Sequence, residues 1–343
     1  MIDQAVDLPA AAPYDGGRPF PTAGGPSRSG ARKLQLALTG LVTIAPLVGL
    51  GLAVWLMWGR GLGITDVLLA AGFYVFTGFG VTVGFHRLIT HRGFTARPWL
   101  RVGLAIAGSM AFQGEVIDWV AIHRRHHAFT DRPGDPHSPY RYGTGVLGLA
   151  RGLADAHTGW MFRNDPTPAA RYAPDLLADP AMVRVARAFP VLCALSLTLP
   201  AVLGWVVGGD LRSAWTAFLW AGLVRILLLQ HVTWSINSLC HMIGSRPHTT
   251  RRFDRSTDLW PLALLSFGES WHNGHHSQPS CARHGIGPHQ IDPSAGLIRI
   301  FERLGWATDV HWPATEPPDR RHHDREDPPD PRWVSPPAQP TDR

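Results

Sequence analysis

The chain has 343 residues, enough for one large domain or two small ones, and carries a net charge of +6 with a pI near 9.8. A basic balance is typical of nucleic-acid-binding proteins. Here, however, the arginines flank long apolar stretches, as the positive-inside rule describes for membrane proteins. Composition therefore leaves no role for nucleic acid as a partner and favours a protein that contacts membrane lipid.

In chain order, residues 1–33 are rich in Pro, Gly and charge, and we expect a disordered tail. One membrane domain follows over residues 34–312, and a second disordered tail of the same composition occupies 313–343. Within the domain, four stretches are long and apolar enough to span a bilayer, namely 35–59, 67–85, 188–209 and 213–236.

A fifth apolar run, residues 102–114, is short for a span and predicts an interfacial or protein-buried helix. The two turns that intervene between spans, 60–66 and 209–212, are very short. Arginines gather before the first span and after the second and fourth, which predicts that both termini are cytoplasmic. Three cysteines without C-x-x-C spacing are expected to be packing residues.

Three histidine clusters follow apolar stretches on that same side: residues 86–91, 123–127 and 272–276. The chain has 18 histidines, and the pattern H-x-x-H-H is expected by chance roughly 0.04 times, yet it occurs twice. Neutral imidazole is a good ligand for Fe, Zn, Cu and Ni. The clusters therefore predict a metal centre beside a membrane.

On a helix, positions i and i+4 lie about 40° apart, so the first and last histidines of H-x-x-H-H can share one ion. The histidine between them is turned about 100° away and can reach a second ion. The sharing pairs are His123 with His127 and His272 with His276, and the turned residues are His126 and His275. His86 and His91 lie about 140° apart, so a helix end or bend must separate them.

Acidic residues near the clusters are predicted to orient the imidazoles and offset the ionic charge; the alternative for each is a solvated acid or a helix cap. They are Glu115, Asp118, Asp131, Asp135, Asp258 and Glu269. His157 and His231 are expected to be hydrogen-bonded core residues. Surface positions or positions behind the ligands are expected for His137, His248, His284, His289 and His311.

The motifs resemble the membrane acyl-CoA Δ9 desaturases, the stearoyl-CoA desaturase family, over about residues 35–312. The matching stretches are GFHRLITHRGF, AFQGEVIDWVAIHRRHHAFTDRPGDPHSP, AHTGWMF, HVTWSINSLCH and FGESWHNGHHSQPSCARHG. The end of the match is similar to bacterial, particularly actinobacterial, members. The resemblance implies an all-α integral membrane protein whose four transmembrane helices carry a cytoplasmic helical cap with a histidine-rich di-iron site.

The resemblance also implies a ninth histidine ligand, His241, and a metal-bound water held by Asn237. One iron would then be bound by His86, His91, His123, His127 and His275, and the other by His126, His241, His272 and His276. The implied reaction uses O₂ to remove two hydrogens from a saturated fatty acyl chain. It leaves a cis double bond, at Δ9, and water.

Gln113, Trp119 and Thr233 match the residues that bend the acyl chain in the family. The implied carrier is CoA, although Gly114 stands where many members have Asn, and Gly274 departs from the usual third cluster. No fused His-Pro-Gly-Gly segment is present, so a separate electron donor of the ferredoxin, flavoprotein or cytochrome b5 type is expected. The implied location is the bacterial cell membrane, with the active site facing the cytoplasm.

Two alternatives remain. A di-iron hydroxylase of lipids or alkanes would use similar histidine clusters, and product analysis separates it from a desaturase. A metal transporter predicts ionisable residues at mid-membrane depth, whereas here only Arg225 and His231 lie inside a span. For a desaturase, Ala70 and Tyr74 lie one helical turn apart on span 2, and Tyr74 is the predicted plug of the acyl tunnel unless it is ordinary core packing.

Overall fold

The computed structural model describes residues 28–58 and 62–313. The predicted tails therefore lie outside the described residues, except that helix already begins at Arg28, inside the segment expected to be disordered. The chain divides into two compact units, residues 1–38 and 39–343. All elements after the start of the first helix belong to the second unit.

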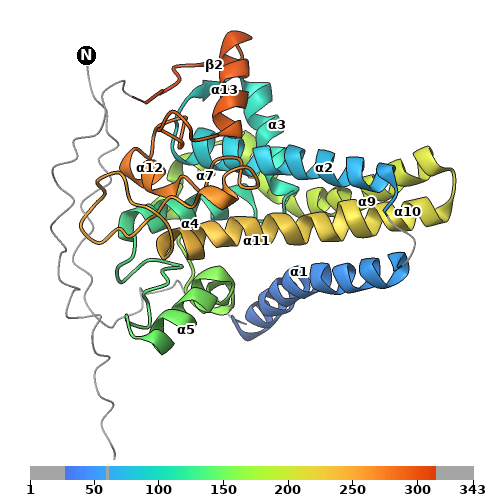
Figure 1. Cartoon of the computed structure of the whole chain (residues 1–343), viewed down its shortest axis with the longest axis horizontal. Helices are drawn as coiled ribbons and strands as arrows, with labels where there is room; N and C mark the ends of the chain where they lie inside the picture. Colours follow the sequence, from blue (N-terminus) through green and yellow to red (C-terminus); the bar gives the residue numbers. More distant parts are fainter. Residues whose placement is uncertain (1–27, 59–61, 314–343) are drawn as a thin grey trace, which may run out of the picture. The chain divides into compact units, whose positions relative to one another are not determined.

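The structure is almost entirely helical, and Figure 1 shows the order of its elements. They are α1 (Arg28–Met57), α2 (Ile64–Phe79), η1 (Gly80–Thr90), β1 (Thr95–Ala96), α3 (Pro98–Ser109), α4 (Val116–Phe129), α5 (Val146–His157), η2 (Gly159–Phe162), α6 (Ala169–Tyr172), α7 (Pro174–Leu177), α8 (Pro180–Arg187), α9 (Phe189–Gly208), α10 (Leu211–Ala217), η3 (Phe218–Val224), α11 (Arg225–Ser238), η4 (Leu239–His241), η5 (Trp260–Leu262), α12 (His272–Ser277), α13 (Pro293–Arg303) and β2 (Ala307–Thr308).

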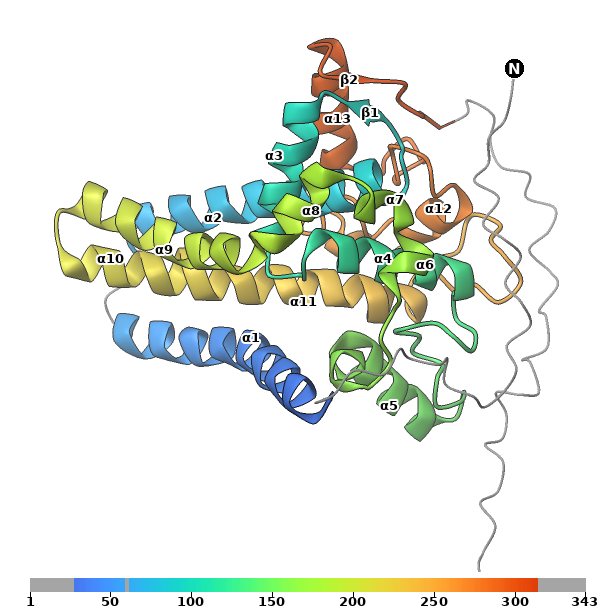
Figure 2. The same cartoon turned by 180° about the vertical axis from the view of Figure 1, so that it is seen from behind.

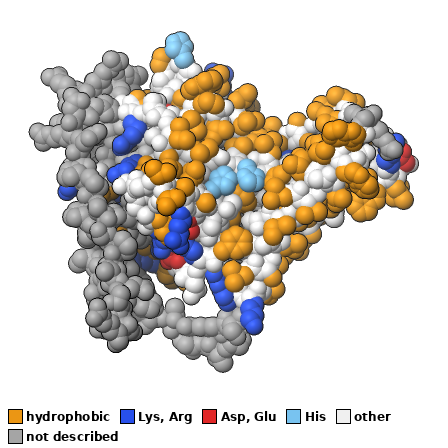
Figure 3. Space-filling view, turned by 60° about the horizontal axis from the view of Figure 1, so that its bottom comes forward, with side chains coloured by type: hydrophobic (Ala, Val, Ile, Leu, Met, Phe, Trp, Pro, Cys, Tyr) orange, Lys and Arg blue, Asp and Glu red, His pale blue; other side chains and the backbone are white. Residues whose placement is uncertain are grey.

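Four helices in the described part of the chain are long and apolar enough to cross a membrane, which confirms the predicted spans. They cover Arg32–Leu56, Ile64–Thr90, Phe189–Gly208 and Leu211–His241. Leucine, valine and tryptophan side chains are exposed along these helices, and Figure 3 shows such a face with few charged side chains among them. The second and fourth spans extend further than expected, because the second continues as helix into the first histidine cluster and the fourth continues as far as His241.

The second and fourth spans each contain a π-helical segment, η1 and η3. In η1 the amide of His91 donates to the carbonyl of His86 over 3.1 Å, a bond across five residues. Such i→i+5 bonding brings residues five apart onto one face. The predicted helix end is present, since helix stops at Thr90, but the wider turn is what aligns the two histidines.

Arg225 is 2 % exposed inside the fourth span, and its guanidinium donates to oxygens of its own span, of α9 and of the residue after α3. Nη2 donates to the Ser196 carbonyl over 3.0 Å and to the Ser196 hydroxyl over 2.9 Å, and Nε donates to the Ala221 carbonyl over 2.9 Å. Pro200 lies four residues after Ser196 and has no N–H for that carbonyl. Arg225 therefore supplies the donor that proline removes from α9.

The remaining helices form a cap at one end of the spans, with α4, α12 and α13 close to the ends of α2 and α11 (Figure 2). Its core includes Phe85, Leu104, Val120 and Ile298, each buried to 8 % exposure or less. Helix α3, from the run predicted to be interfacial or buried, packs against η1. Two short antiparallel strands, with Thr95 opposite Thr308, join the end of η1 to the chain after α13.

Candidate metal centre

Two groups of imidazole nitrogens converge where η1, α4, η4 and α12 meet. The larger group contains His86 and His91 at the end of η1, His123 and His127 on α4, and His275 on α12. The smaller and fully buried group contains His126, His241, His272 and His276. Within each group all ligand atoms lie within 4.8 Å of one another. The membership is the same as in the two ligand sets that the family resemblance implies.

The nitrogens face one another at ligand spacing. In the larger group, Nε2 of His86 is 3.1 Å from Nε2 of His275, and Nε2 of His123 is 3.0 Å from Nε2 of His127. In the smaller group, Nε2 of His272 is 3.1 Å from Nε2 of both His241 and His276. Two imidazoles that bind one ion at about 2.1 Å and at a right angle hold their nitrogens about 3.0 Å apart.

Carboxylates fix the opposite nitrogen of four rings. Nδ1 of His276 contacts Asp254 at 2.7 Å, Nδ1 of His241 contacts Asp131 at 2.8 Å, and Nδ1 of His126 contacts Asp135 at 3.0 Å. His86 pairs with Glu269 in the same way. When Nδ1 of a ring carries the proton and donates it in a hydrogen bond to the carboxylate, Nε2 of the same ring keeps a free lone pair. Lone pairs that face each other at 3 Å repel unless a cation lies between them.

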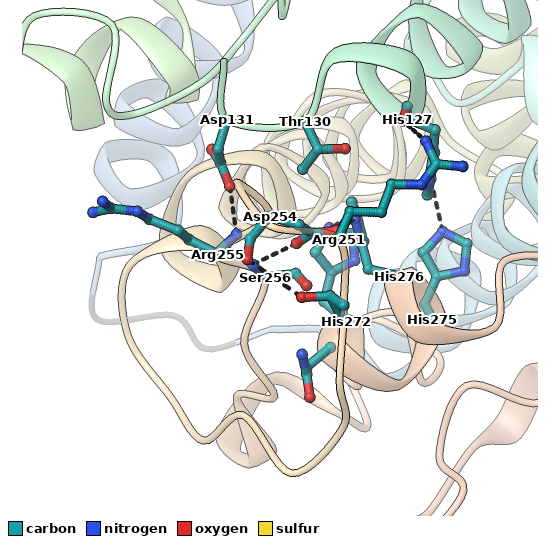
Figure 4. Close-up of polar contacts among 12 residues, drawn as sticks. His127, Thr130, Asp131, Arg251, Asp254, Arg255, Ser256, His272, His275 and His276 are labelled. Atoms are coloured by element: carbon teal, nitrogen blue, oxygen red, sulfur yellow. Dashed lines mark hydrogen bonds and ion pairs between the residues drawn. The ribbon is translucent and has the colours of Figure 1, made fainter. Parts of the chain in front are cut away.

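The carboxylate of Asp254 was not among the acids singled out from the sequence. It is 22 residues from His276 along the chain, so proximity in sequence gives no signal. Figure 4 shows the segment that carries Asp254 lying against the histidines, with Ser256 N donating to its other oxygen over 2.9 Å. In the same view the Arg251 guanidinium donates to the carbonyl of His127 over 3.2 Å.

The other predicted acids have different roles. Glu115 caps α4, accepting hydrogen bonds from the amides of Ile117 and Asp118. Asp258 accepts from the amides of Asn273 and Gly274 and so holds the start of α12. Burial raises the pKa of Asp258 to about 6. These residues position the helices that carry the clusters rather than the imidazoles themselves.

The protonation states suit metal binding. Burial, with smaller contributions from neighbouring imidazoles, lowers the pKa of His123, His127 and His275 well below the usual value. The same causes act on His91 and His272. Neutral imidazoles keep the lone pair that a metal ion needs. The carboxylate pKa values of Asp135 and Asp254 are lowered despite burial, because His126 and His276 contact them.

Both glycines that depart from the family pattern have a structural reason. A Cβ on Gly274 would lie 2.6 Å from the carbonyl oxygen of His284, so a larger residue would displace α12 from its neighbour. Gly114 has φ +105°, a conformation that side-chain-bearing residues rarely adopt. Neither structural reason indicates which acyl carrier the protein binds.

A cavity opens from the two groups between the second and fourth spans. Its lining includes Trp119 and Thr233, two of the three predicted substrate residues, and Asn237. Gln113 is not in this lining; its buried Nε2 has no hydrogen-bond partner in the part of the chain that the structure describes. Apart from its end at the histidines, the cavity is walled mainly by apolar side chains, as the binding site of an apolar chain would be.

The remaining histidines divide by environment. His137 is buried and stacks on His126, and His284 is buried against His275 with ring centroids 4.3 Å apart. Both therefore lie behind the predicted ligands rather than at the surface. His157 and His231 contact each other through ring nitrogens 3.0 Å apart, as expected for satisfied side chains. His248 is buried, whereas His289 and His311 are exposed.

Comparison with known proteins agrees with this site. A family model described as fatty acid desaturase matches residues 62–290. The hex-5-enoyl-[acyl-carrier protein] acetylenase of Moorena producens is 36% identical over 278 residues, 80% of this chain and 86% of that protein. The sn-1 stearoyl-lipid 9-desaturase of Anabaena variabilis is 35% identical over 69% of this chain and 80% of that protein. Delta-9 acyl-lipid desaturase 2 of Arabidopsis thaliana is 38% identical over 73% of this chain and 75% of that protein.

Proposed function

This chain belongs to the fatty acid desaturase family and introduces a double bond into a fatty acyl chain, and we propose that two iron ions held by nine histidines carry out the reaction. The observation that carries the proposal is the pair of Nε2 groups facing one another about 3 Å apart. Nε2 of His126 is buried without a hydrogen-bond partner among the described residues, as a ligand nitrogen would be. An all-imidazole donor set suits iron.

When bound, the two irons would supply the activation of O₂ that removes two hydrogens from adjacent methylenes, leaving a cis double bond and water. The reduction of O₂ to two waters needs two more electrons and two protons; we propose that the electrons come from a separate ferredoxin-, flavoprotein- or cytochrome b5-type donor and the protons from solvent. The carboxylates of Glu269, Asp131 and Asp254 keep the imidazole rings oriented toward the ions.

Other side chains would position the substrate. Trp119 stacks on His123 with ring planes 13° apart and lines the cavity, so an acyl chain passing the centre would lie against its indole. Thr233 faces the same cavity while its hydroxyl donates to the Leu229 carbonyl. We propose that Asn237 holds a water bound to metal. The apolar walls exclude bulk water from the reacting methylenes.

We further propose acyl-CoA as the carrier, Δ9 as the bond position and the bacterial cell membrane as the location, with the centre and both termini cytoplasmic. Two of the relatives above are named for position 9, which supports the bond position. Those two are named for lipid-bound chains and a third for an acyl-carrier protein, so CoA is proposed from the motif resemblance and not from these names. Membranes given labelled stearoyl-CoA and sampled within one turnover test the carrier. Labelled oleate should appear first in the CoA pool; its first appearance in glycerolipid would replace CoA by lipid.

Product analysis tests the reaction. Cells that express the chain and receive stearate should accumulate a cis monounsaturated acid, located by mass spectrometry of a double-bond adduct. An alcohol in place of the alkene would make the protein a hydroxylase. His126→Ala and His275→Ala should abolish the product while the protein remains in the membrane. His289→Ala, at an exposed histidine, should retain it and serves as the matched control.

A further inference from the structure

The cavity beside the metal centre has a floor that can be located on the fourth span. Its lining on α11 runs from Asn237, next to the histidines, to Leu229. These residues are eight apart, about 12 Å along the helix at 1.5 Å per residue. On the second span the lining ends at Val81, and no residue before it belongs to the lining among those the structure describes. The methyl end of an acyl chain that passes the histidines would lie at this floor.

Besides Leu229 and Val81, the floor of the cavity includes Phe267, which lies on the turn before the third histidine cluster. Its side chain belongs to the cavity lining and is 5 % exposed. Its backbone has φ +55°, a region that phenylalanine rarely occupies and that surrounding structure must enforce. The turn is held by Gly268 N donating to the Ala263 carbonyl over 2.8 Å and by Ser294 N donating to the Phe267 carbonyl over 3.2 Å.

The phenyl ring of Phe267 occupies the space that a side chain on Gly78 would fill. A Cβ built on Gly78 would lie 2.2 Å from Cε2 of Phe267. Even the methyl group of an alanine at position 78 would therefore clash with the ring. The ring also packs on Phe79 and Tyr74, with centroids 4.8 and 5.5 Å away. The missing side chain of Gly78 therefore sets how far the ring withdraws from the cavity.

Tyr74, the plug predicted from the sequence, has a different position. It is not part of the cavity lining, and its hydroxyl donates to the Leu265 carbonyl over 2.7 Å. Tyr74 thus supports the turn from behind, while the ring that faces the cavity belongs to Phe267.

We propose that Phe267 ends the acyl pocket and sets the longest chain that the enzyme accepts, and that Gly78 fixes the position of its ring. The inference rests on the proposed desaturation of an acyl chain in this cavity. It places the limit on chain length on the turn that leads into the third histidine cluster. The bond position, set at the other end of the pocket, should not change with this residue.

Substitutions on the two sides of the contact should act in opposite directions. Phe267→Ala and Phe267→Leu shorten the side chain and, like phenylalanine, carry a Cβ, so neither relieves the positive-φ backbone as glycine would. Cells that express each variant receive an equal mixture of myristate, palmitate, stearate and arachidate. In cells with Phe267→Ala, the ratio of each unsaturated product to the one two carbons shorter should rise on the order of 10-fold. Phe267→Leu should shift it less. Gly78→Ala should push the ring into the cavity and favour shorter chains.

Gly72→Ala is the matched control, because Gly72 lies on the same helix and nothing lies within 4 Å of a Cβ there. It should leave the product ratio unchanged. Gly78→Ala should also lose its effect when combined with Phe267→Ala, since the clashing ring is gone. This double variant keeps the inference testable if Gly78→Ala alone does not accumulate.

Three results would overturn the inference: a wild-type product ratio in Phe267→Ala, an equal shift in Gly78→Ala and Gly72→Ala, or lengthening in Tyr74→Ala without lengthening in Phe267→Ala. Each of them still includes a double bond in the product. Failure of the proposed function would look different, because wild type itself would then give an alcohol or no product.

Discussion

Single carboxylates decide which way the imidazole rings face. Asp254 is 3 % exposed and contacts Nδ1 of His276, so replacing it by asparagine removes a buried charge and weakens the orientation of that ring. Loss of such a partner typically costs about 10–100-fold in metal affinity or activity. Asp254→Asn should therefore lose metal from the four-histidine group at lower chelator concentration than wild type.

Elemental analysis after dialysis against graded chelator measures this effect. Asp309→Asn is the control, because Asp309 is exposed and contacts only Thr308 among the hydrogen bonds found for it. Equal metal retention in Asp254→Asn, Asp309→Asn and wild type would show that Asp254 does not orient a ligand.

Asp175 makes stability depend on acid pH. Burial alone would raise the pKa of this carboxyl group, but hydrogen bonds from Arg124 and Arg92 outweigh it and lower the pKa to about 2. An unfolded aspartate has a pKa of about 3.9, so the folded state gains stability from this group above pH 4 and loses it as pH falls toward 2. Asp175→Asn should unfold at lower temperature than wild type at pH 7.

The difference in unfolding temperature between the two proteins should narrow between pH 4 and pH 2. Thermal unfolding in detergent micelles, followed by circular dichroism, gives both curves. A difference that stays constant across this range would mean that the ion pair does not stabilise the fold.

Among the elements, α9 and the fourth span are joined by a contact that depends on a proline. The guanidinium of Arg225 donates to the Ser196 carbonyl, which Pro200 leaves without its helical donor. Arg225→Met should destabilise the protein by about 1–3 kcal/mol, the cost of an unsatisfied buried polar group. In a Pro200→Ala background the helical N–H returns, so the same substitution should cost less.

A double-mutant cycle on unfolding in detergent measures the coupling between the two positions. An additive pair, with the same cost of Arg225→Met in both backgrounds, would disprove the link. The control is Arg299→Met, at a residue half-exposed on α13.

Elements whose signal is local could be predicted from the sequence, and contacts between distant segments could not. Length and hydropathy were sufficient for the four spans, and helical spacing for the pairing of His123 with His127. The π-helix of η1 was missed because its apolar pattern reads as ordinary helix. Likewise, nothing in the sequence connects Asp254 with His276 or Gly78 with Phe267, since only the folded chain brings them together.

For the whole molecule, an even number of spans predicts that residues 28 and 313, the two ends of the described part of the chain, lie on the same side of the membrane. Within the described residues four helices qualify as spans, and arginines gather beside their ends at the histidine clusters. Reporter fusions after the last residue and in the 209–212 turn should therefore report opposite sides, with the terminus cytoplasmic. A C-terminus found outside the cell would contradict the proposed orientation, because the metal centre would then face away from the cytoplasm.

The proposed reaction depends on two ions bound by two separate groups of histidines. The most direct measurement is the iron content per chain of the purified protein, made in iron-rich medium, for wild type, His275→Ala and His126→Ala. His275 belongs to the five-histidine group and His126 to the four-histidine group. We expect about two irons in wild type and about one in each variant. One iron in wild type, or two retained in either variant, would contradict the proposed centre.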